Sequence, residues 1–175
     1  MEERSLSVIR ISVRNLVEFV LRSGDLDNRR TAGAKKEAMQ AGGRLHRKIQ
    51  KRMGSEYRAE VSLKHTVDEE EFKLLVEGRA DGVIEEAAGC VIDEIKCIYM
   101  DLKYLEDADP VHLAQAKCYA YFLACDRELA AMGVQITYCN IESEEVRRFR
   151  FDYSFEELEE WFLGLVHEYV KWARF

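Results

Sequence analysis

Alternating apolar and polar residues fill the middle of this 175-residue chain and predict β-strands there. One strand is expected over residues 57–67 and a second over residues 72–77. The next stretch, residues 78–96, reads GRADGVIEEAAGCVIDEIK. It predicts two strands joined by a tight turn over Ala87–Gly89, because glycine adopts positive φ without strain. Together these segments predict an antiparallel meander of three or four strands.

Helical periodicity precedes the meander. After a short strand-like opening, Ser12 is placed to cap a helix that we expect to end near Ser23–Gly24. A second helix is expected over residues 33–53 and should stop at Gly54. Two helices therefore lead into the strands.

Helices and strands alternate after the meander. Asp109–Pro110 predicts a helix start, with Asp as the cap and Pro at the first helical position. Two strands are expected over residues 134–141 and 146–151. The pair Ser154–Glu157 forms a capping box for a final helix, whose apolar positions should include Trp172. This order predicts an α/β (α+β) fold with a mixed central sheet flanked by helices.

Length and composition bound the class of protein. A chain of this length suits one domain that buries about 70% of its unfolded surface, so we expect residues 1–175 to form a single domain. The opening MEERSLSVIR lacks the apolar core of a signal peptide. No apolar run approaches the ~18 residues that a membrane helix needs. These features predict a cytoplasmic protein that is not bound to a membrane.

Positive charge is concentrated in one part of a chain whose net charge is −7. Residues 28–58 contain ten Lys or Arg and two acids, a local balance of +8. This asymmetry suits a surface that contacts nucleic-acid phosphates, although a solvated basic helix face gives the same pattern. The candidates for phosphate contact lie on the polar side of the second helix and are Arg44, Lys48, Lys51 and Arg52.

The five cysteines form no CxxC pair, and their number is odd. Both facts argue against a disulfide framework or a zinc knuckle. Cys118 and Cys125 are seven residues apart and share one helical face, where cysteine is most often a small core residue. We expect all five side chains to be structural free thiols.

Two carboxylates and an ammonium group should converge in the hairpin of residues 78–96. Side chains alternate between the faces of a strand, so Glu94 and Lys96 share a face, and folding brings Asp81 towards them. Carboxylates among apolar residues need a partner or a cation, and Mg²⁺ takes oxygen ligands. The alternative is a surface hairpin in which Lys96 forms a salt bridge with one of the two acids.

Four motifs, in this order and spacing, resemble the PD-(D/E)xK nuclease superfamily, and most closely its RecB-like exonuclease branch. The motifs are Gly43-x-x-His46, Gly78-Arg79-Ala80-Asp81, Glu94-Ile95-Lys96 and Gln115-x-x-x-Tyr119. The resemblance implies a restriction-endonuclease-like core. It also implies a DNA nuclease that depends on Mg²⁺ or Mn²⁺ and acts as an exonuclease, or on ends or flaps, in DNA repair or recombination.

The resemblance also implies a role for each motif residue. Metal binding would fall to four residues, namely His46, Asp81, Glu94 and, through its carbonyl group, Ile95. Lys96 would hold or help to activate the attacking water and neutralise developing charge. Gln115 and Tyr119 would brace the site and contact the backbone of single-stranded DNA or of DNA ends and flaps.

Two features depart from parts of this superfamily. The first acid of the signature triplet is Glu94 rather than Asp, a difference that the superfamily allows. Many members also hold an iron–sulfur cluster with four cysteines, and this chain lacks that cysteine pattern, so we expect no cluster.

The segment ISVRNLVEFVLRSGDLDNR is similar to the start of bacterial proteins in which a nuclease domain precedes an excision-repair-type helicase. A fused or associated helicase is therefore the expected partner.

Two other functions fit the same residues. The domain could be a non-catalytic DNA-binding platform of a helicase, although the presence of Asp81, Glu94 and Lys96 argues against lost catalysis. It could also be an α/β interaction domain in which the motifs coincide by chance. Cleavage of labelled DNA with a divalent metal separates these functions from a nuclease.

Overall fold

Six strands form one mixed sheet in the structure, a computed structural model that describes residues 6–21 and 32–173. The strands are β1 (Ser7–Ser12), β2 (Tyr57–Asp68), β3 (Phe72–Glu86), β4 (Gly89–Ile98), β5 (Ala131–Asn140) and β6 (Val146–Ser154). The helices are α1 (Val13–Leu21), α2 (Ala32–Arg52), α3 (Pro110–Arg127) and α4 (Phe155–Trp172), with a short 3₁₀ helix η1 (Leu102–Tyr104). This arrangement confirms the expected mixed α/β fold and is consistent with a restriction-endonuclease-like core.

The long strand β3 has two edges that are used differently. Strand β2 pairs antiparallel along almost the whole of one edge. The other edge is shared, because β1 pairs parallel with β3 only as far as Glu77, and β4 pairs antiparallel with it only from Gly82 onwards. Residues 78–81 therefore lie at a fork, where β1 has ended and β4 has not yet joined.

The second half of the sheet continues from β4. Strand β5 pairs parallel with β4, and the chain reaches it through η1 and α3. Strand β6 then returns antiparallel to β5. Parallel strands need a crossover connection, and α3 lies within the connection from β4 to β5.

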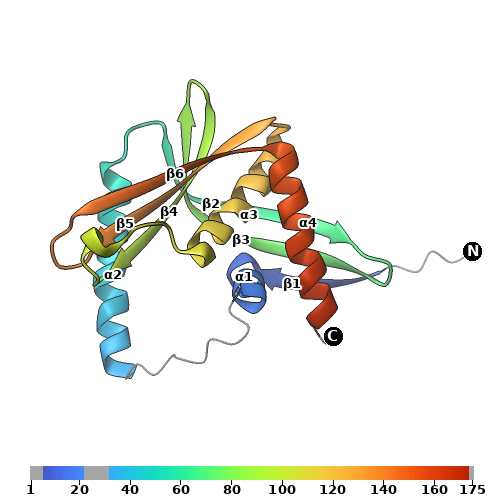
Figure 1. Ribbon diagram of the computed structural model, residues 1–175, viewed down its shortest axis with the longest axis horizontal. Helices are drawn as coiled ribbons and strands as arrows, with labels where there is room; N and C mark the ends of the chain where they lie inside the picture. Colours follow the sequence, from blue (N-terminus) through green and yellow to red (C-terminus); the bar gives the residue numbers. More distant parts are fainter. Residues whose placement is uncertain (1–5, 22–31, 174–175) are drawn as a thin grey trace, which may run out of the picture.

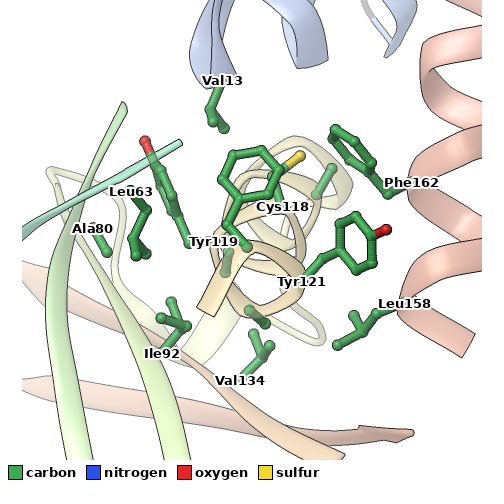
Figure 2. Packing of buried hydrophobic residues seen from close by; sticks show 14 of the residues in the cluster. Val13, Leu63, Ala80, Ile92, Cys118, Tyr119, Tyr121, Val134, Leu158 and Phe162 are labelled. Carbon is green, nitrogen blue, oxygen red and sulfur yellow. The ribbon is translucent and has the colours of Figure 1, made fainter. Parts of the chain in front are cut away.

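Helices cover both faces of the sheet (Figure 1). On one face, α3 packs between the sheet and the helices α1 and α4. Figure 2 shows its side chains pointing to all sides, with Tyr119 towards Leu63 of β2 and Tyr121 towards Phe162 of α4. A helix that is apolar all round must be buried on every side, and α3 is the central element of the main core.

The other face of the sheet is covered by α2. Leu45 and Ile49 of this helix are buried against Ile95 of β4 and Cys139 of β5, in a second and smaller core cluster. The two faces of β4 therefore belong to different cores. Its alternate residues, including Glu94 and Lys96, face α3.

Local signals in the sequence are confirmed where they set turns and helix starts. Gly89 closes the hairpin with a φ of 139°. The Asp109 side chain accepts a hydrogen bond from the Val111 backbone (2.8 Å), and Ser154 and Glu157 form both halves of a capping box. Ser12 accepts from the backbone of Asn15. The expected helix end near Ser23–Gly24 lies outside the described residues.

Two sequence expectations are wrong. Residues 72–77 and 78–86 form one 15-residue strand, because β2 pairs with β3 on both sides of the expected break, through Lys64–Glu77 and Leu63–Gly78, so the meander has three strands. Trp172, expected among apolar core positions, is 65% exposed at the end of α4. His112 of α3 is half-buried, and its Nδ1 lies 2.8 Å from the Tyr138 hydroxyl.

The cysteines are free thiols, as expected. Cys90, Cys118 and Cys139 are buried, and burial raises the pKa of each thiol. None of the helices within residues 6–21 and 32–173 combines the length and apolar character that crossing a bilayer requires.

Candidate active site

The fork in β3 brings the two acids of the signature motifs together. Asp81 is the first β3 residue beyond the β4 ladder, and Glu94 is its neighbour across the gap. The Glu94 Oε1 atom accepts a hydrogen bond from the Asp81 backbone N–H (3.3 Å), and Asp81 Oδ2 accepts from the Ile95 N–H (2.7 Å). The carboxylates thus replace strand pairing at the point where the strands separate.

Two glycines of β3 let tyrosine side chains lie across the strand. A Cβ atom at Gly78 would overlap the hydroxyl group and ring of Tyr119. A Cβ atom at Gly82 would overlap the ring of Tyr57 in the same way. These close approaches explain why glycine stands on both sides of Arg79-Ala80-Asp81.

Lys96 reaches the same side of the sheet as Glu94. Its Nζ donates a hydrogen bond to Gln115 Oε1 (2.9 Å) and lies 3.8 Å from Glu94 Oε2. Gln115 is buried in the first half of α3, and Tyr119 follows one turn later on the same helix face. The expected grouping of Lys96 with these two α3 side chains is therefore seen in the structure.

His46 approaches Asp81 from α2. Its Nε2 lies 3.3 Å from Asp81 Oδ1 and 3.6 Å from Glu60 Oε1. One ligand atom from each of these three residues lies within 4.8 Å of the other two. Glu94 stands beside this group through its contact with the Asp81 backbone rather than within it. Ile95 lines the same cleft, and its backbone N–H binds Asp81.

Glu60 is a member of the site that sequence reasoning missed. It has a φ of 57° near the start of β2, opposite Asp81, at a point that is absent from the β2–β3 register. Its carboxylate contacts Arg79 (2.8 Å) and accepts from Gln50 (3.0 Å). Left-handed backbone at a non-glycine residue is uncommon and often marks a functional site.

The electrostatics of the acids differ. Burial, reinforced by the negative charge of Asp81, raises the pKa of Glu94 well above its usual range, although Lys96 opposes the shift. The hydrogen bond with Asp81 raises the pKa of His46, against the opposing effect of burial. Two carboxylates that disfavour each other's charge make an environment in which a cation is favourable.

A third buried acid lies on the opposite face of β4. Asp93 is 1% exposed and accepts hydrogen bonds from Tyr57 (2.8 Å), Thr137 (2.6 Å) and Gln135 (3.2 Å). Three neutral donors satisfy this carboxylate, as buried polar groups require. Asp93 points away from Glu94, as strand alternation predicts, and fastens the start of β2 to β4 and β5.

The side chains in the fork fit a hard divalent cation. Mg²⁺ binds oxygen ligands and commonly takes only one or two protein carboxylates, and Asp81 and Glu60 offer oxygen atoms beside the His46 nitrogen. Transition ions such as Mn²⁺ also accept an imidazole ligand. Two of these donors, His46 and Asp81, line a cleft of about 380 Å³ together with Glu94, Lys96, Gln115 and Tyr119.

The four basic residues expected to contact phosphate are all exposed on α2. None of Arg44, Lys48, Lys51 and Arg52 lines this cleft, and Lys48 forms an ion pair with Glu144 (2.8 Å). Arg14 and Glu18 of α1 do line it, and sequence reasoning did not assign them. Their presence follows from the fold, because α1 begins directly after β1, whose end forms one side of the fork.

Comparison with solved structures supports the fold. No protein-family model and no curated protein matches the chain. The crystal structure of SSO0001 superposes with a TM-score of 0.62 at 18% identity, over 98% of this chain and 77% of that one. An alkaline exonuclease, LHK-Exo from Laribacter hongkongensis, gives a TM-score of 0.44 at 13% identity, over 93% and 91% of the two chains. At these identities the likeness to SSO0001 establishes a shared mixed α/β fold.

Proposed function

We propose that this chain is a metal-dependent nuclease that hydrolyses phosphodiester bonds in DNA. The observation that carries the proposal is the convergence, at the fork in β3, of two acids, a lysine and a histidine from three elements. Asp81 and Glu94 meet across the strand gap, Lys96 lies 3.8 Å from Glu94, and His46 lies 3.3 Å from Asp81. In an ordinary surface hairpin Glu94 would be exposed, and no histidine from α2 would contact Asp81.

The proposed division of labour follows from these contacts. Asp81, Glu94 and His46 would hold Mg²⁺ or Mn²⁺, with the Ile95 carbonyl group and Glu60 as further candidates. When bound, the cation supplies positive charge to the phosphate and makes water a better nucleophile. Lys96 would orient that water and stabilise the negative charge that develops on the phosphate oxygens.

Gln115 and Tyr119 would position other groups in the site and would not react themselves. Gln115 accepts a hydrogen bond from Lys96 and so fixes the direction of the ammonium group. The Tyr119 hydroxyl, close to Gly78 and hydrogen-bonded by the Arg79 backbone, lies at the wall of the same cleft and can contact a phosphate oxygen. Preorganised groups of this kind need no rearrangement when charge develops.

Finer assignments belong to the same proposal. The motif resemblance supports the RecB-like branch, exonuclease or flap processing in DNA repair or recombination, and a fused or associated helicase as partner. The basic side chains of α2, Arg44, Lys48, Lys51 and Arg52, would bind the DNA backbone outside the cleft. A cytoplasmic location fits all of these roles.

The proposal is tested by incubating the protein with end-labelled single-stranded and double-stranded DNA. Mg²⁺ or Mn²⁺ should support cleavage, and a chelator should stop it. If DNA binds but remains intact with both metals, the domain is instead a non-catalytic platform and the proposal fails.

Lys96→Ala separates catalysis from binding. Lys96 is 27% exposed in its side chain and adds little to the core, so the variant should fold and should still bind metal and DNA. Hydrolysis should fall by roughly 10²–10³, the usual loss when one preorganised charge is removed from a transition state. Lys64→Ala, an exposed lysine on β2, is the matched control and should cleave DNA normally. Equal cleavage by Lys96→Ala and wild type would refute the mechanism.

A further inference from the structure

A second cleft adjoins the candidate active site and differs from it in character. It has a volume of about 700 Å³, within the range of ligand-binding clefts, and extends between α1, α2 and the ends of β4 and β5. Arg14, His46, Ile95, Lys96 and His112 line both clefts, so the two are continuous. We call this larger space the side cleft.

The walls of the side cleft are largely apolar. Ile98 and Ile141 lie at its wall, and Tyr99, Met100 and Met39 line it while remaining 49%, 46% and 67% exposed. Exposed apolar side chains that gather at one cleft usually mark a binding site, whereas scattered ones do not. Methionine adapts its shape to different partners, and tyrosine offers a flat aromatic face.

The charges at the junction of the clefts indicate the kind of ligand. Lys96 and Arg14 lie where the side cleft meets the acidic site, and both are positive. A ligand that spans the junction would place an anionic group beside Lys96 and an apolar, flat group beside Tyr99. A nucleotide within a strand has this combination, with a phosphate next to a planar base.

Only an unpaired base can use such a cleft. In a duplex each base is stacked on both faces and shows only its edges in the grooves, so a base must leave the stack to enter a pocket. Aromatic side chains that stack on bases tolerate every sequence, because every base has a π face.

We propose that the side cleft binds an unpaired nucleobase of the strand whose phosphate lies at Asp81 and Glu94, and that the substrate is therefore single-stranded or frayed at its end. This inference rests on the proposed nuclease function and specifies its substrate class. Tyr99 would supply the stacking face, and Met100 and Met39 would close around the base.

The test measures binding of three labelled oligonucleotides with Ca²⁺ in place of Mg²⁺. They are an oligothymidine strand, a strand of the same length composed of abasic residues, and a blunt duplex. The wild type should bind the thymidine strand about tenfold or more tightly than the abasic strand, as expected when stacking on one base is added to phosphate contacts.

Tyr99→Ala should remove this preference and leave binding to the abasic strand and the duplex unchanged. Tyr99→Trp keeps an aromatic face and should retain the preference. Tyr104→Ala is the matched control, since Tyr104 is 67% exposed and lines neither cleft. The Asn140 side chain binds the backbone carbonyl of residue 99, so the Tyr99 substitutions leave that contact in place.

The proposal is overturned if the wild type binds the abasic and thymidine strands equally, or if Tyr99→Ala keeps the preference. The apolar wall would then be a contact surface for another protein. Failure of the nuclease function shows itself separately, as the absence of cleavage by the wild type with Mg²⁺ or Mn²⁺, whatever the binding results are.

Discussion

Gly78 stands where the side chain of Tyr119 crosses β3, and this contact can be tested by adding one methyl group. In Gly78→Ala the new Cβ would overlap the Tyr119 hydroxyl group and ring. We expect the free energy of unfolding to fall by about 1–3 kcal/mol, the usual result of overpacking, as measured by urea denaturation. Nuclease activity should fall as well, because Tyr119 lies at the wall of the cleft.

The control for this prediction is Gly164→Ala. Apart from its chain neighbours and the nearby backbone of its own helix, α4, nothing lies within 4 Å of a Cβ placed at Gly164. Alanine there should stabilise the protein by about 0.5–1 kcal/mol. A double-mutant cycle tests the cause, since Gly78→Ala should cost much less in a Tyr119→Ala background. An equal cost in both backgrounds would mean that Tyr119 is not the obstacle.

The metal ligands can be distinguished by titration calorimetry with Mn²⁺. Asp81→Ala should abolish binding, because Asp81 contacts His46 and lies within the ligand group. Glu60→Gln and Glu94→Gln keep the size of each side chain and remove one charge. Weaker binding in both variants would mean that the ion lies between the two acids, whereas an effect of only one would identify the third ligand. Equal binding by Asp81→Ala and wild type would remove the metal from the fork.

At the residue scale, the sequence predicted most of the side chains that meet in the candidate active site, but not all of them. Asp81, Glu94 and Lys96 could be predicted because strand alternation and a hairpin turn place them by local rules. Glu60 could not, because its position opposite Asp81 depends on the register between β2 and β3 and on a left-handed φ of 57°. Neither feature leaves a pattern in the sequence.

At the scale of elements, α2 carries two functions on different sides. Leu45 and Ile49 face the sheet, and His46 reaches Asp81, whereas the basic side chains point to solvent. They are not equivalent, because Lys48 is held by Glu144 at 2.8 Å. The sequence predicted a basic surface here, and it could not predict this ion pair between residues 96 positions apart.

This difference predicts unequal effects on DNA binding. Changing Arg44 and Lys51 to Glu should weaken binding to all sequences alike and should reduce the salt slope by about two phosphate contacts. Lys48→Glu should have a smaller effect, because Glu144 already competes for that ammonium group. Affinity measured by fluorescence anisotropy over a salt series checks both statements. An unchanged salt slope in the Arg44 and Lys51 variant would make this helix face merely solvated.

The boundaries of elements show where local reasoning stops. The residues of β3 were predicted as two strands with a break before Gly78, and Gly82 follows four residues later. In the structure both glycines lie within one strand and make room for Tyr119 and Tyr57. Both glycines therefore reflect packing against residues far away in sequence. The helix caps at Asp109 and Ser154, by contrast, depend only on residues within one turn and were predicted correctly.

At the scale of the whole molecule, His65 lies where the sheet, α3 and α4 meet. Its ring stacks on Phe122, with 5.6 Å between centroids, and meets Tyr121 and Phe162 edge-on. Burial lowers the pKa of His65 below its ordinary value of 6.5, although Asp126 and Glu159 favour the charged form. The packing of β2, α3 and α4 around His65 therefore favours the neutral form of its imidazole ring.

The consequence is a loss of stability in mild acid. Above the unfolded pKa of about 6.5, His65 is neutral in both states and costs nothing. As the pH falls from 6.5 through the lower folded pKa, the unfolded chain takes up the proton first, so the free energy of unfolding falls by at most about 1.4 kcal/mol per pH unit from this residue. His65→Phe should remove this contribution, and denaturation of wild type and variant at about pH 7.5 and about pH 5, with a chelator present, measures it. His167→Gln changes an exposed histidine of α4 and should keep the wild-type dependence. If His65→Phe loses as much stability between the two pH values as the wild type does, His65 is not the source of this loss of stability in acid.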